Sequence, residues 1–270
     1  MSRVLDATSN ALDGWLSGHR RPLILGICGA QGSGKSTLSR HLCERIEARG
    51  GRVALLSIDD LYLSRKARTQ MAVDVHPLFA TRGVPGTHDV GLGLAVLDGL
   101  RRGTAVRLPR FDKSSDDPKP ESEWPVVDRP VDVVLFEGWC VGARPQDEAA
   151  LSTPINDLER DYDPDGRWRH AVNAALGGPY RDLFARLDRL VFLAAPDFAV
   201  VRAWRTQQEH GLKHRLKREG RRGSHVMSDA EVGRFVQYYE RLTRHILATM
   251  PAYADLTLRL DEARGAVGIV

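Results

Sequence analysis

The segment from residue 29 to residue 36, GAQGSGKS, constrains this chain more than any other feature. It fits the phosphate-binding pattern G-x-x-x-x-G-K-[ST], with an apolar run before it and a helical pattern after it. Glycines in such a loop let successive backbone N–H groups point at phosphate oxygens, and the helix N-terminus adds its positive dipole end. A glycine-rich turn that matches by chance is the alternative, and the flanking strand and helix argue against it. The sequence therefore predicts a nucleoside triphosphate site formed by Gly29, Ala30, Gln31, Gly32, Ser33, Gly34, Lys35, Ser36 and Thr37.

The rest of the chain alternates short apolar runs with amphipathic stretches, which is typical of a parallel sheet covered by helices. We expect strands at residues 23–28, 53–58, 131–136, 190–193 and 256–260, and helices at 4–17, 35–49, 90–101, 179–187, 198–210 and 229–249. Ser228 and Glu231 form a capping-box pattern before the last helix. No linker is visible, so we predict one α/β domain over residues 1–270 with the P-loop nucleoside triphosphate hydrolase fold. Two long loops, 64–89 and 104–129, are expected to be functional or disordered.

Composition excludes several other classes of protein. The chain has 270 residues, of which 42% are hydrophobic and 27% charged, so it is too apolar to be disordered. Its apolar runs fall short of the roughly 18 residues that a transmembrane helix needs, and the N-terminus lacks the apolar stretch of a secretory signal. Three cysteines without CxxC spacing support neither a disulfide framework nor a zinc site. We therefore expect a cytoplasmic protein without a membrane partner.

Carboxylates follow two of the predicted strands. Asp59 and Asp60 end the run at 53–58, and because the carboxyl ends of parallel strands share one edge, they should face the phosphate-binding loop. One of them, with Asp59 preferred, is suited to act as the base for a substrate hydroxyl. Capping of the following helix is the alternative for either residue. Glu137 ends the run at 131–136 and, with the Ser36 hydroxyl, is a candidate Mg²⁺ ligand, while Lys35 is expected to reach the β- and γ-phosphates.

The remaining motifs favour a small-molecule kinase. The guanine-reading tetrapeptide N-K-x-D of GTPases does not occur in the sequence. Candidate substrate-binding residues lie in the long loops and beside the acid pair: Asp60, Tyr62, Thr87, His88, Asp89, Arg110 and Lys113. Arg110 and Lys113 suit an anionic substrate, because a guanidinium and an ammonium both bind carboxylate or phosphate oxygens. Solvated loop charges, and an ordinary hydrogen-bonded role for His88, are the alternatives.

Positive charge is concentrated in one segment. Residues 201–225 contain eight Lys or Arg and two Glu, a net charge of +6, whereas the whole chain carries +4. We interpret residues 202–227 as a basic lid, in which Arg202 and Arg205 share a helix face and neutralise the transferring phosphoryl group. A solvated surface helix and a nucleic-acid patch are the alternatives; no aromatic-rich basic face supports the second, so no nucleic-acid partner is expected.

Taken in order, GAQGSGKS, SIDDLY, RGVPGTHD, LPRFDKS and VVLFEGW resemble the D-glycerate 3-kinase group of the phosphoribulokinase, uridine kinase and pantothenate kinase superfamily. The resemblance runs from about residue 23 to 142 and resumes near the C-terminus. It implies transfer of the γ-phosphoryl of ATP, with Mg²⁺, to the primary hydroxyl of D-glycerate. It also implies that Asp59 is the base and Glu137 the Walker B acid, and that Arg110 and Lys113 meet the substrate carboxylate.

Two other functions stay open at this point. One is a kinase for a nucleoside, a pantothenate-like compound or a sugar. The other, from a different class, is an ATP-binding regulatory or nucleic-acid-associated protein that uses the basic segment for contacts. Residues 151–179 and the oligomeric state yield no prediction.

Overall fold

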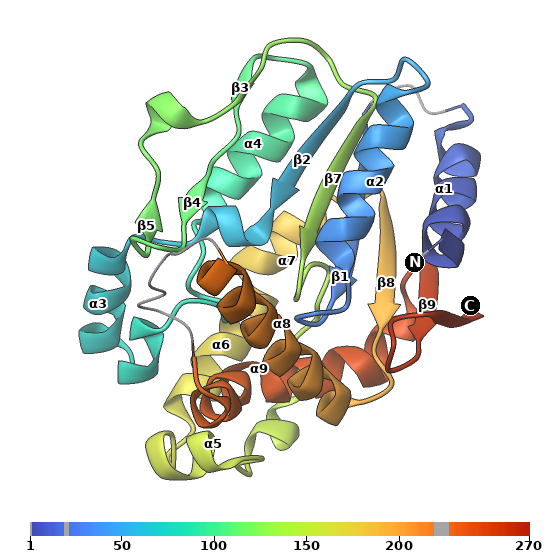
Figure 1. Cartoon of the computed structure of the whole chain (residues 1–270). Helices are drawn as coiled ribbons and strands as arrows, with labels where there is room; N and C mark the ends of the chain where they lie inside the picture. The colour runs from blue at the N-terminus through green and yellow to red at the C-terminus, as the bar shows by residue number, and fades with distance from the viewer. Residues whose placement is uncertain (1, 19–21, 219–226) are drawn as a thin grey trace.

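A six-stranded sheet forms the centre of the molecule, in a computed structural model that describes residues 2–18, 22–218 and 227–270 (Figure 1). The strand order is β10-β9-β8-β1-β7-β2. The strands are β1 (Leu23–Gly29), β2 (Val53–Ser57), β7 (Val133–Gly138), β8 (Arg189–Ala194), β9 (Leu256–Leu260) and β10 (Ala266–Ile269). The first five run parallel to one another, as predicted, but β10 pairs antiparallel with β9. The sheet is therefore mixed, because the short turn after β9 can only bring the chain back in the opposite direction.

Helices cover both faces of this sheet. On one face, Leu25 and Ile27 of β1 lie in a core cluster with residues of α1, α2 and α8; on the other, Ile24 and Cys28 lie in a cluster with residues of α4, α7 and α9. This alternation follows from the two-residue period of a strand buried on both sides. The helices are α1 (Ser2–Leu16), α2 (Lys35–Glu47), α3 (Arg65–Asp74), α4 (Val90–Arg102), α5 (Asp157–Tyr162), α6 (Arg167–Gly177), α7 (Pro179–Phe184), α8 (Phe198–Arg218) and α9 (Asp229–Thr249).

The two segments predicted as long loops contain regular structure. The first includes helix α3, whose one buried side chain is that of Arg68; a helix with so few apolar residues gives no hydrophobic period. The second is folded by two short antiparallel pairs, β3 (Val106–Arg107) with β6 (Val126–Val127), and β4 (Phe111–Asp112) with β5 (Asp117–Pro118). Short 3₁₀ turns complete the described elements: η1 (Ile58–Leu61), η2 (Pro77–Ala80), η3 (Glu121–Glu123), η4 (Glu148–Leu151) and η5 (Met250–Ala252).

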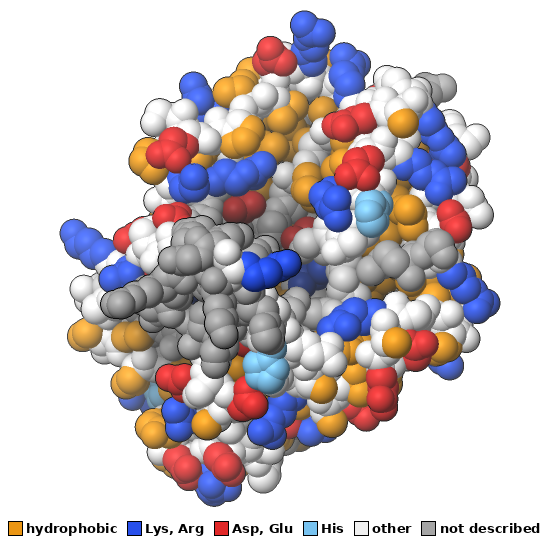
Figure 2. Space-filling model, viewed as in Figure 1, with side chains coloured by type: hydrophobic (Ala, Val, Ile, Leu, Met, Phe, Trp, Pro, Cys, Tyr) orange, Lys and Arg blue, Asp and Glu red, His pale blue; other side chains and the backbone are white. Residues whose placement is uncertain are grey.

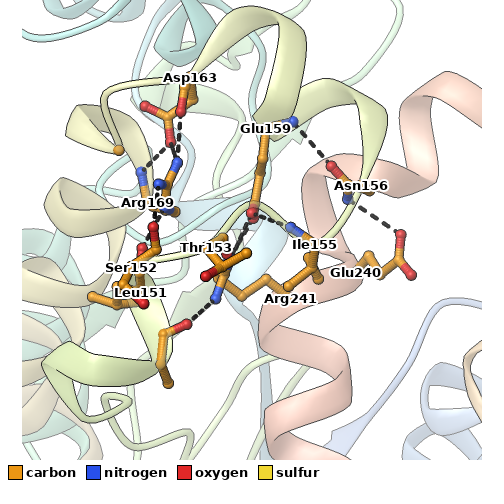
Figure 3. A network of polar contacts seen from close by, with 12 residues as sticks. Leu151, Ser152, Thr153, Ile155, Asn156, Glu159, Asp163, Arg169, Glu240 and Arg241 are labelled. Atoms are coloured by element: carbon orange, nitrogen blue, oxygen red, sulfur yellow. Dashed lines mark hydrogen bonds and ion pairs between the residues drawn. The ribbon is translucent and has the colours of Figure 1, made fainter.

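A buried ion-pair network attaches helices α5 and α6, which the sequence did not predict, to the rest of the fold (Figure 3). Arg241 of α9 donates from Nε and Nη2 to the Glu159 carboxylate at 2.7 and 2.6 Å, and to the carbonyls of residues 150 and 153. Arg169 of α6 pairs with Asp163 at 3.0 Å. Both carboxylates are fully buried. We call Glu159, Arg241, Asp163 and Arg169 the ion-pair network.

None of the helices in the described ranges combines the length and the apolar character that crossing a bilayer requires.

Candidate active site

The phosphate-binding loop connects β1 to α2 at the carboxyl edge of the sheet. Gly32 and Gly34 have φ of 80° and 93°, a left-handed conformation that glycine adopts without steric cost. Gly34 is the N-cap of α2, and no side chain caps this helix end. The first amides of α2 are therefore open to an anion, as the sequence pattern requires. Ser33 Oγ is buried in the loop without a hydrogen-bond partner among the described residues.

Two elements distant in sequence hold this loop from outside. Trp204 of α8 packs so closely on Gly32 that a Cβ there would overlap the Trp204 side chain. Arg264, in the turn between β9 and β10, donates from Nη2 to Gln207 and lies 5.0 Å from the centre of the Trp204 ring. Its Nε donates to the carbonyl of Gly32 at 2.5 Å. These contacts were not predictable from sequence, because they depend on the tertiary packing of α8 and the C-terminal strands.

Oxygen ligands for a divalent cation meet where β1 and β7 lie side by side. Ser36 Oγ donates to Glu137 Oε1 at 3.0 Å, so the two predicted Mg²⁺ ligands are in direct contact. Glu137 is 6% exposed, and its Oε2 is buried without a partner in the described part of the chain. A buried carboxylate oxygen with no donor is costly unless a cation binds it. A hydroxyl and a carboxylate are hard oxygen donors, and they fit Mg²⁺.

Asp59 lies just beyond β2, in turn η1, and its carboxylate is contacted by two donors. The Tyr62 hydroxyl donates to Oδ1 at 2.7 Å, and Lys113 Nζ donates to Oδ2 at 2.6 Å. Partial burial by itself would raise the pKa of Asp59, but Lys113, Lys35 and the Tyr62 hydrogen bond together lower that pKa to about 2. Asp59 is therefore ionised at neutral pH and can accept a hydrogen bond from a substrate hydroxyl.

Asp60 contacts residues of the second predicted long loop, 104–129, rather than Lys113 or Tyr62. Its Oδ1 accepts from the backbone N–H of Phe111 at 3.1 Å, and its Oδ2 lies 3.5 Å from Arg110 Nη1. Burial raises the pKa of Asp60 despite these contacts. The two adjacent acids therefore have different surroundings: Asp59 faces Lys35 and Lys113, whereas Asp60 anchors strand β4.

His88 and Tyr62 form one wall beside Asp59. Their rings stack with centroids 4.7 Å apart, and His88 Nδ1 lies 2.5 Å from the hydroxyl of Tyr180. Burial lowers the pKa of His88 to about 4, so the imidazole is neutral at pH 7. Its Nε2 is buried without a partner among the described residues. His88 and Tyr62 thus lie next to the predicted base, and their contact with a substrate stays a prediction.

Thr87 and Asp89 use their side chains on nearby backbone. The Thr87 hydroxyl donates to the Val84 carbonyl at 2.7 Å and accepts from the N–H of Gly83 at 3.0 Å. Asp89 is the N-cap of α4, where its Oδ1 accepts from the N–H of Leu92 at 2.8 Å. Substrate binding by Thr87 and Asp89 stays a prediction, and these backbone bonds weigh against it because they occupy the polar atoms that a substrate would need.

The predicted lid is only partly within the described residues. Its start is the helix α8, where Arg205 pairs with Glu209 and lies 5.4 Å from the ring centre of Phe235 on α9. Arg202 is exposed and lies beside Gly233 of α9. Residues 219–226 of the predicted lid lie outside the described part of the chain. Both arginines therefore contact α9 in this structure, and their role in phosphoryl transfer stays a prediction.

Arg82 is a residue of this region that sequence reasoning did not assign, although it opens the RGVPGTHD motif. It pairs with Asp116, and its guanidinium carbon lies 5.7 Å from the ring centre of Phe111.

Figure 2 shows a hollow near the middle of this face of the molecule, with Lys and Arg side chains around it. Figure 1 shows the ends of β1, β2 and β7 at the same edge. We call the charged residues of this region the acceptor cluster: Asp59, Asp60, Asp116, Lys35, Arg65, Arg68, Arg82, Arg110 and Lys113.

Comparisons with known proteins agree with this arrangement. A family model described as methylmalonyl Co-A mutase-associated GTPase MeaB matches residues 6–63, a minor part of the chain. An uncharacterized kinase of Schizosaccharomyces pombe is 36% identical over 233 residues, which cover 81% of this chain and 79% of that protein. The chloroplastic D-glycerate 3-kinase of Arabidopsis thaliana is 29% identical over 264 residues, 91% of this chain and 54% of that protein. The structure of D-glycerate 3-kinase from Cryptococcus neoformans aligns with a TM-score of 0.78 and 26% identity, covering 99% of this chain and 98% of that chain.

Proposed function

Because this chain belongs to the family of D-glycerate 3-kinase-like P-loop kinases, which use ATP with Mg²⁺, we propose that it phosphorylates the primary hydroxyl of D-glycerate to give 3-phosphoglycerate. One observation carries the proposal. An ionised carboxylate, Asp59, lies within the electrostatic reach of the P-loop lysine, Lys35, and is bordered by cationic side chains. That combination suits a small acceptor with one hydroxyl to deprotonate and one negative charge to bind.

The reaction needs little covalent chemistry from the protein, so positioning and charge supply most of the catalysis. The amides of the loop and Lys35 hold the β- and γ-phosphates. Ser36 and Glu137 hold Mg²⁺, which neutralises charge on the phosphate oxygens. Asp59 orients the acceptor hydroxyl and takes its proton as the hydroxyl oxygen bonds to the γ-phosphorus. The bond from that phosphorus to the bridging β–γ oxygen breaks, and ADP leaves. Arg202 and Arg205 supply further positive charge from α8.

Entry of the acceptor requires a change at Asp59. Lys113 now occupies Oδ2, but its side chain is 60% exposed and is held by this one ion pair among the described residues. An exposed ion pair of this kind contributes about 1 kcal/mol or less, so a bound substrate can displace it. Lys113 is then free to contact the acceptor's negative charge, as the sequence predicted.

A panel of acceptors tests the proposal. ADP release is measured with D-glycerate, L-glycerate, glycerol, uridine and pantothenate at a fixed ATP concentration, and the product is identified by ³¹P and ¹³C NMR. We expect kcat/KM for D-glycerate to exceed that for glycerol and uridine by about 100-fold or more, since a site that binds a carboxylate rejects acceptors without one. L-Glycerate and pantothenate do carry a carboxylate, so they test instead whether the site selects the configuration and the size of the acceptor. Phosphate must appear on the C3 oxygen. Turnover of uridine or pantothenate without turnover of D-glycerate would overturn the proposal in favour of another small-molecule kinase.

A further inference from the structure

Three cationic side chains lie next to the predicted base, and they differ in what already neutralises them. Lys113 donates to Asp59. Arg110 uses Nη1 on its neighbouring carbonyl, Pro109 O, at 2.8 Å and on Asp60 at 3.5 Å. Each of these two cations is therefore in direct contact with one carboxylate, and that carboxylate has no second ion-pair contact among the described residues.

Arg82 shares its carboxylate with two other arginines. Asp116 is contacted by Arg82, by Arg68 Nη2 at 2.7 Å and by Arg65 Nε at 3.6 Å. One negative charge thus faces three guanidinium groups, and the group carries a net charge of +2. The surplus cannot be assigned to Arg68, which is 1% exposed and donates to the carbonyls of Leu63 and Ala80.

The side chain of Arg82 is open and has donors to spare. It is 30% exposed, and among the residues that the structure describes only its Nη1 donates to a protein acceptor, the Asp116 carboxylate. A guanidinium presents five N–H donors in a planar fork that matches the two oxygens of a carboxylate. Arg82 can therefore keep Asp116 and bind a second carboxylate.

Two aromatic rings connect Arg82 to the predicted base. The guanidinium lies over Phe111, the Phe111 ring is edge-on to Tyr62 with centroids 5.2 Å apart, and Tyr62 donates to Asp59. The positive charge of Arg82 also counteracts the burial that raises the pKa of Tyr62. Phe111 and Tyr62 thus form a continuous row of side chains from the guanidinium of Arg82 to the acid that takes the substrate proton.

The backbone around Arg82 is fixed by close packing. Tyr239 Oη donates to the Arg82 carbonyl at 3.2 Å, and Trp139 Nε1 donates to the carbonyl of Gly83 at 2.9 Å. Gly83 has φ of 133°, and a Cβ there would overlap the Tyr239 hydroxyl. Because the backbone is already fixed, only the side chain of Arg82 has to be ordered when a ligand binds, which reduces the entropy that binding must overcome.

We propose that Arg82 is the residue that binds the carboxylate of the acceptor and so selects a short hydroxy acid. The inference rests on the proposed function, because it assigns the anionic end of the same acceptor. Arg82 orients the carboxylate with its planar fork, and Asp59 receives the hydroxyl at the other end of the molecule. Lys113 then supplies a secondary contact to the same carboxylate, and Arg110 supplies long-range attraction.

Kinetics of Arg82→Met test this assignment, with Arg107→Met as the matched control. Arg107 lies outside the acceptor cluster, where it pairs with Glu121, and its side chain is 48% exposed. We expect R82M to raise KM for D-glycerate about 30-fold or more, the usual range for removing one partner of a desolvated charge pair. KM for ATP should stay within about twofold, and R107M should leave both constants within about twofold. Arg82→Lys, which keeps the charge but not the fork, should fall between R82M and wild type.

The neutral amide of the substrate separates binding from a structural role. With D-glyceramide as the acceptor, R82M and wild type should have similar kcat/KM, because no carboxylate is present to lose its partner. Equal losses with the acid and the amide, or an unchanged KM for D-glycerate in R82M, would overturn the assignment while D-glycerate turnover by the wild type stands. If the wild type neither binds nor phosphorylates D-glycerate, the proposed function fails and the Arg82 assignment fails with it. If R82M does not fold, R82K decides by the same acid-to-amide comparison.

Discussion

The ion-pair network and the acceptor cluster use the same residue types for opposite purposes. In the network two arginines face two carboxylates, and none of the four side chains is more than 10% exposed. In the acceptor cluster six cations face three carboxylates, and several side chains are partly exposed, such as Arg82 at 30% and Lys113 at 60%. Matched, buried charges bind the elements of the fold to one another. Surplus, accessible positive charge is what a site for an anion requires.

Replacing Asp59 by asparagine tests whether this residue of the acceptor cluster serves the reaction rather than the stability of the fold. We expect D59N to lower kcat by about 10³–10⁴-fold, since the amide accepts a hydrogen bond but cannot take the hydroxyl proton. The affinity for ATP, measured with a fluorescent analogue, should stay unchanged. The matched control is D60N, whose amide oxygen can still accept from Phe111 and whose kcat should stay within about tenfold of wild type. Near-normal turnover in D59N would remove this residue from the role of base.

Substitutions in the ion-pair network should have the opposite effect: they should lower the free energy of unfolding and leave the kinetic constants unchanged. R241M leaves Glu159 buried without its partner, so the free energy of unfolding should fall by about 3–5 kcal/mol in urea denaturation. KM values measured where the variant is folded should not change.

Arg244 provides the control for this experiment on the same helix. It pairs with Glu240 at 2.7 Å, but its side chain is 58% exposed. R244M should therefore cost less than about 1 kcal/mol. Equal losses in R241M and R244M would contradict the distinction between buried, matched pairs and exposed ones.

The pKa of Asp59 gives a finer test of the acceptor cluster. Burial raises this pKa, whereas Lys113, Lys35 and Tyr62 lower it to about 2, so removing Lys113 in K113M should raise it. The acid limb of kcat/KM, which reports the free enzyme, should move to higher pH. The Lys113 contact also stabilises the folded state at any pH above the pKa that Asp59 has in the unfolded chain. This contribution to the free energy of unfolding is lost as the pH falls towards 2, because Asp59 then becomes protonated.

Lys119→Met is the matched control for the pH profile. Lys119 lies in the same segment and pairs with Glu123 at 3.1 Å, away from Asp59. Its removal should leave the acid limb where it is. An acid limb that moves in K119M as much as in K113M would mean that net charge, rather than the contact with Asp59, sets the profile.

The contrast between the two regions also explains what the sequence predicted. The five parallel strands, the phosphate-binding loop and the contact of Ser36 with Glu137 were all predictable, because apolar runs and strand-end acids obey general rules. Helices α3, α5 and α6 were missed, because buried charged side chains such as Arg68, Glu159 and Arg169 anchor them, and such residues leave no hydrophobic period.

Within the acceptor cluster, residue type alone could not show which cation is available to bind the acceptor's carboxylate. Arg110 and Lys113 drew attention because they are close together in sequence, yet in the structure each is in direct contact with a carboxylate that partly neutralises it. Arg82 stood in a motif that the sequence analysis quoted, but its surplus charge depends on Arg65, Arg68 and Asp116, which come from two other segments. Charge balance of this kind is a property of the folded chain.

The capping box of α9 gives the smallest predicted effect, because this helix carries both Tyr239, which holds the Arg82 backbone, and Arg241 of the network. Ser228 Oγ accepts from the N–H of Glu231 at 3.4 Å, and the Glu231 side chain accepts from the N–H of Ser228 at 2.8 Å. We expect S228A to cost about 1 kcal/mol, which lowers Tm by about 2–4 °C in differential scanning calorimetry. Glu231→Gln, which keeps the capping pattern, should lower Tm less. Fraying of the first turn should reach neither region, because Tyr239 and Arg241 lie about three turns further along. A rise in KM for D-glycerate in S228A would show instead that α9 couples its N-terminus to the acceptor cluster, and the two regions could no longer be treated as independent.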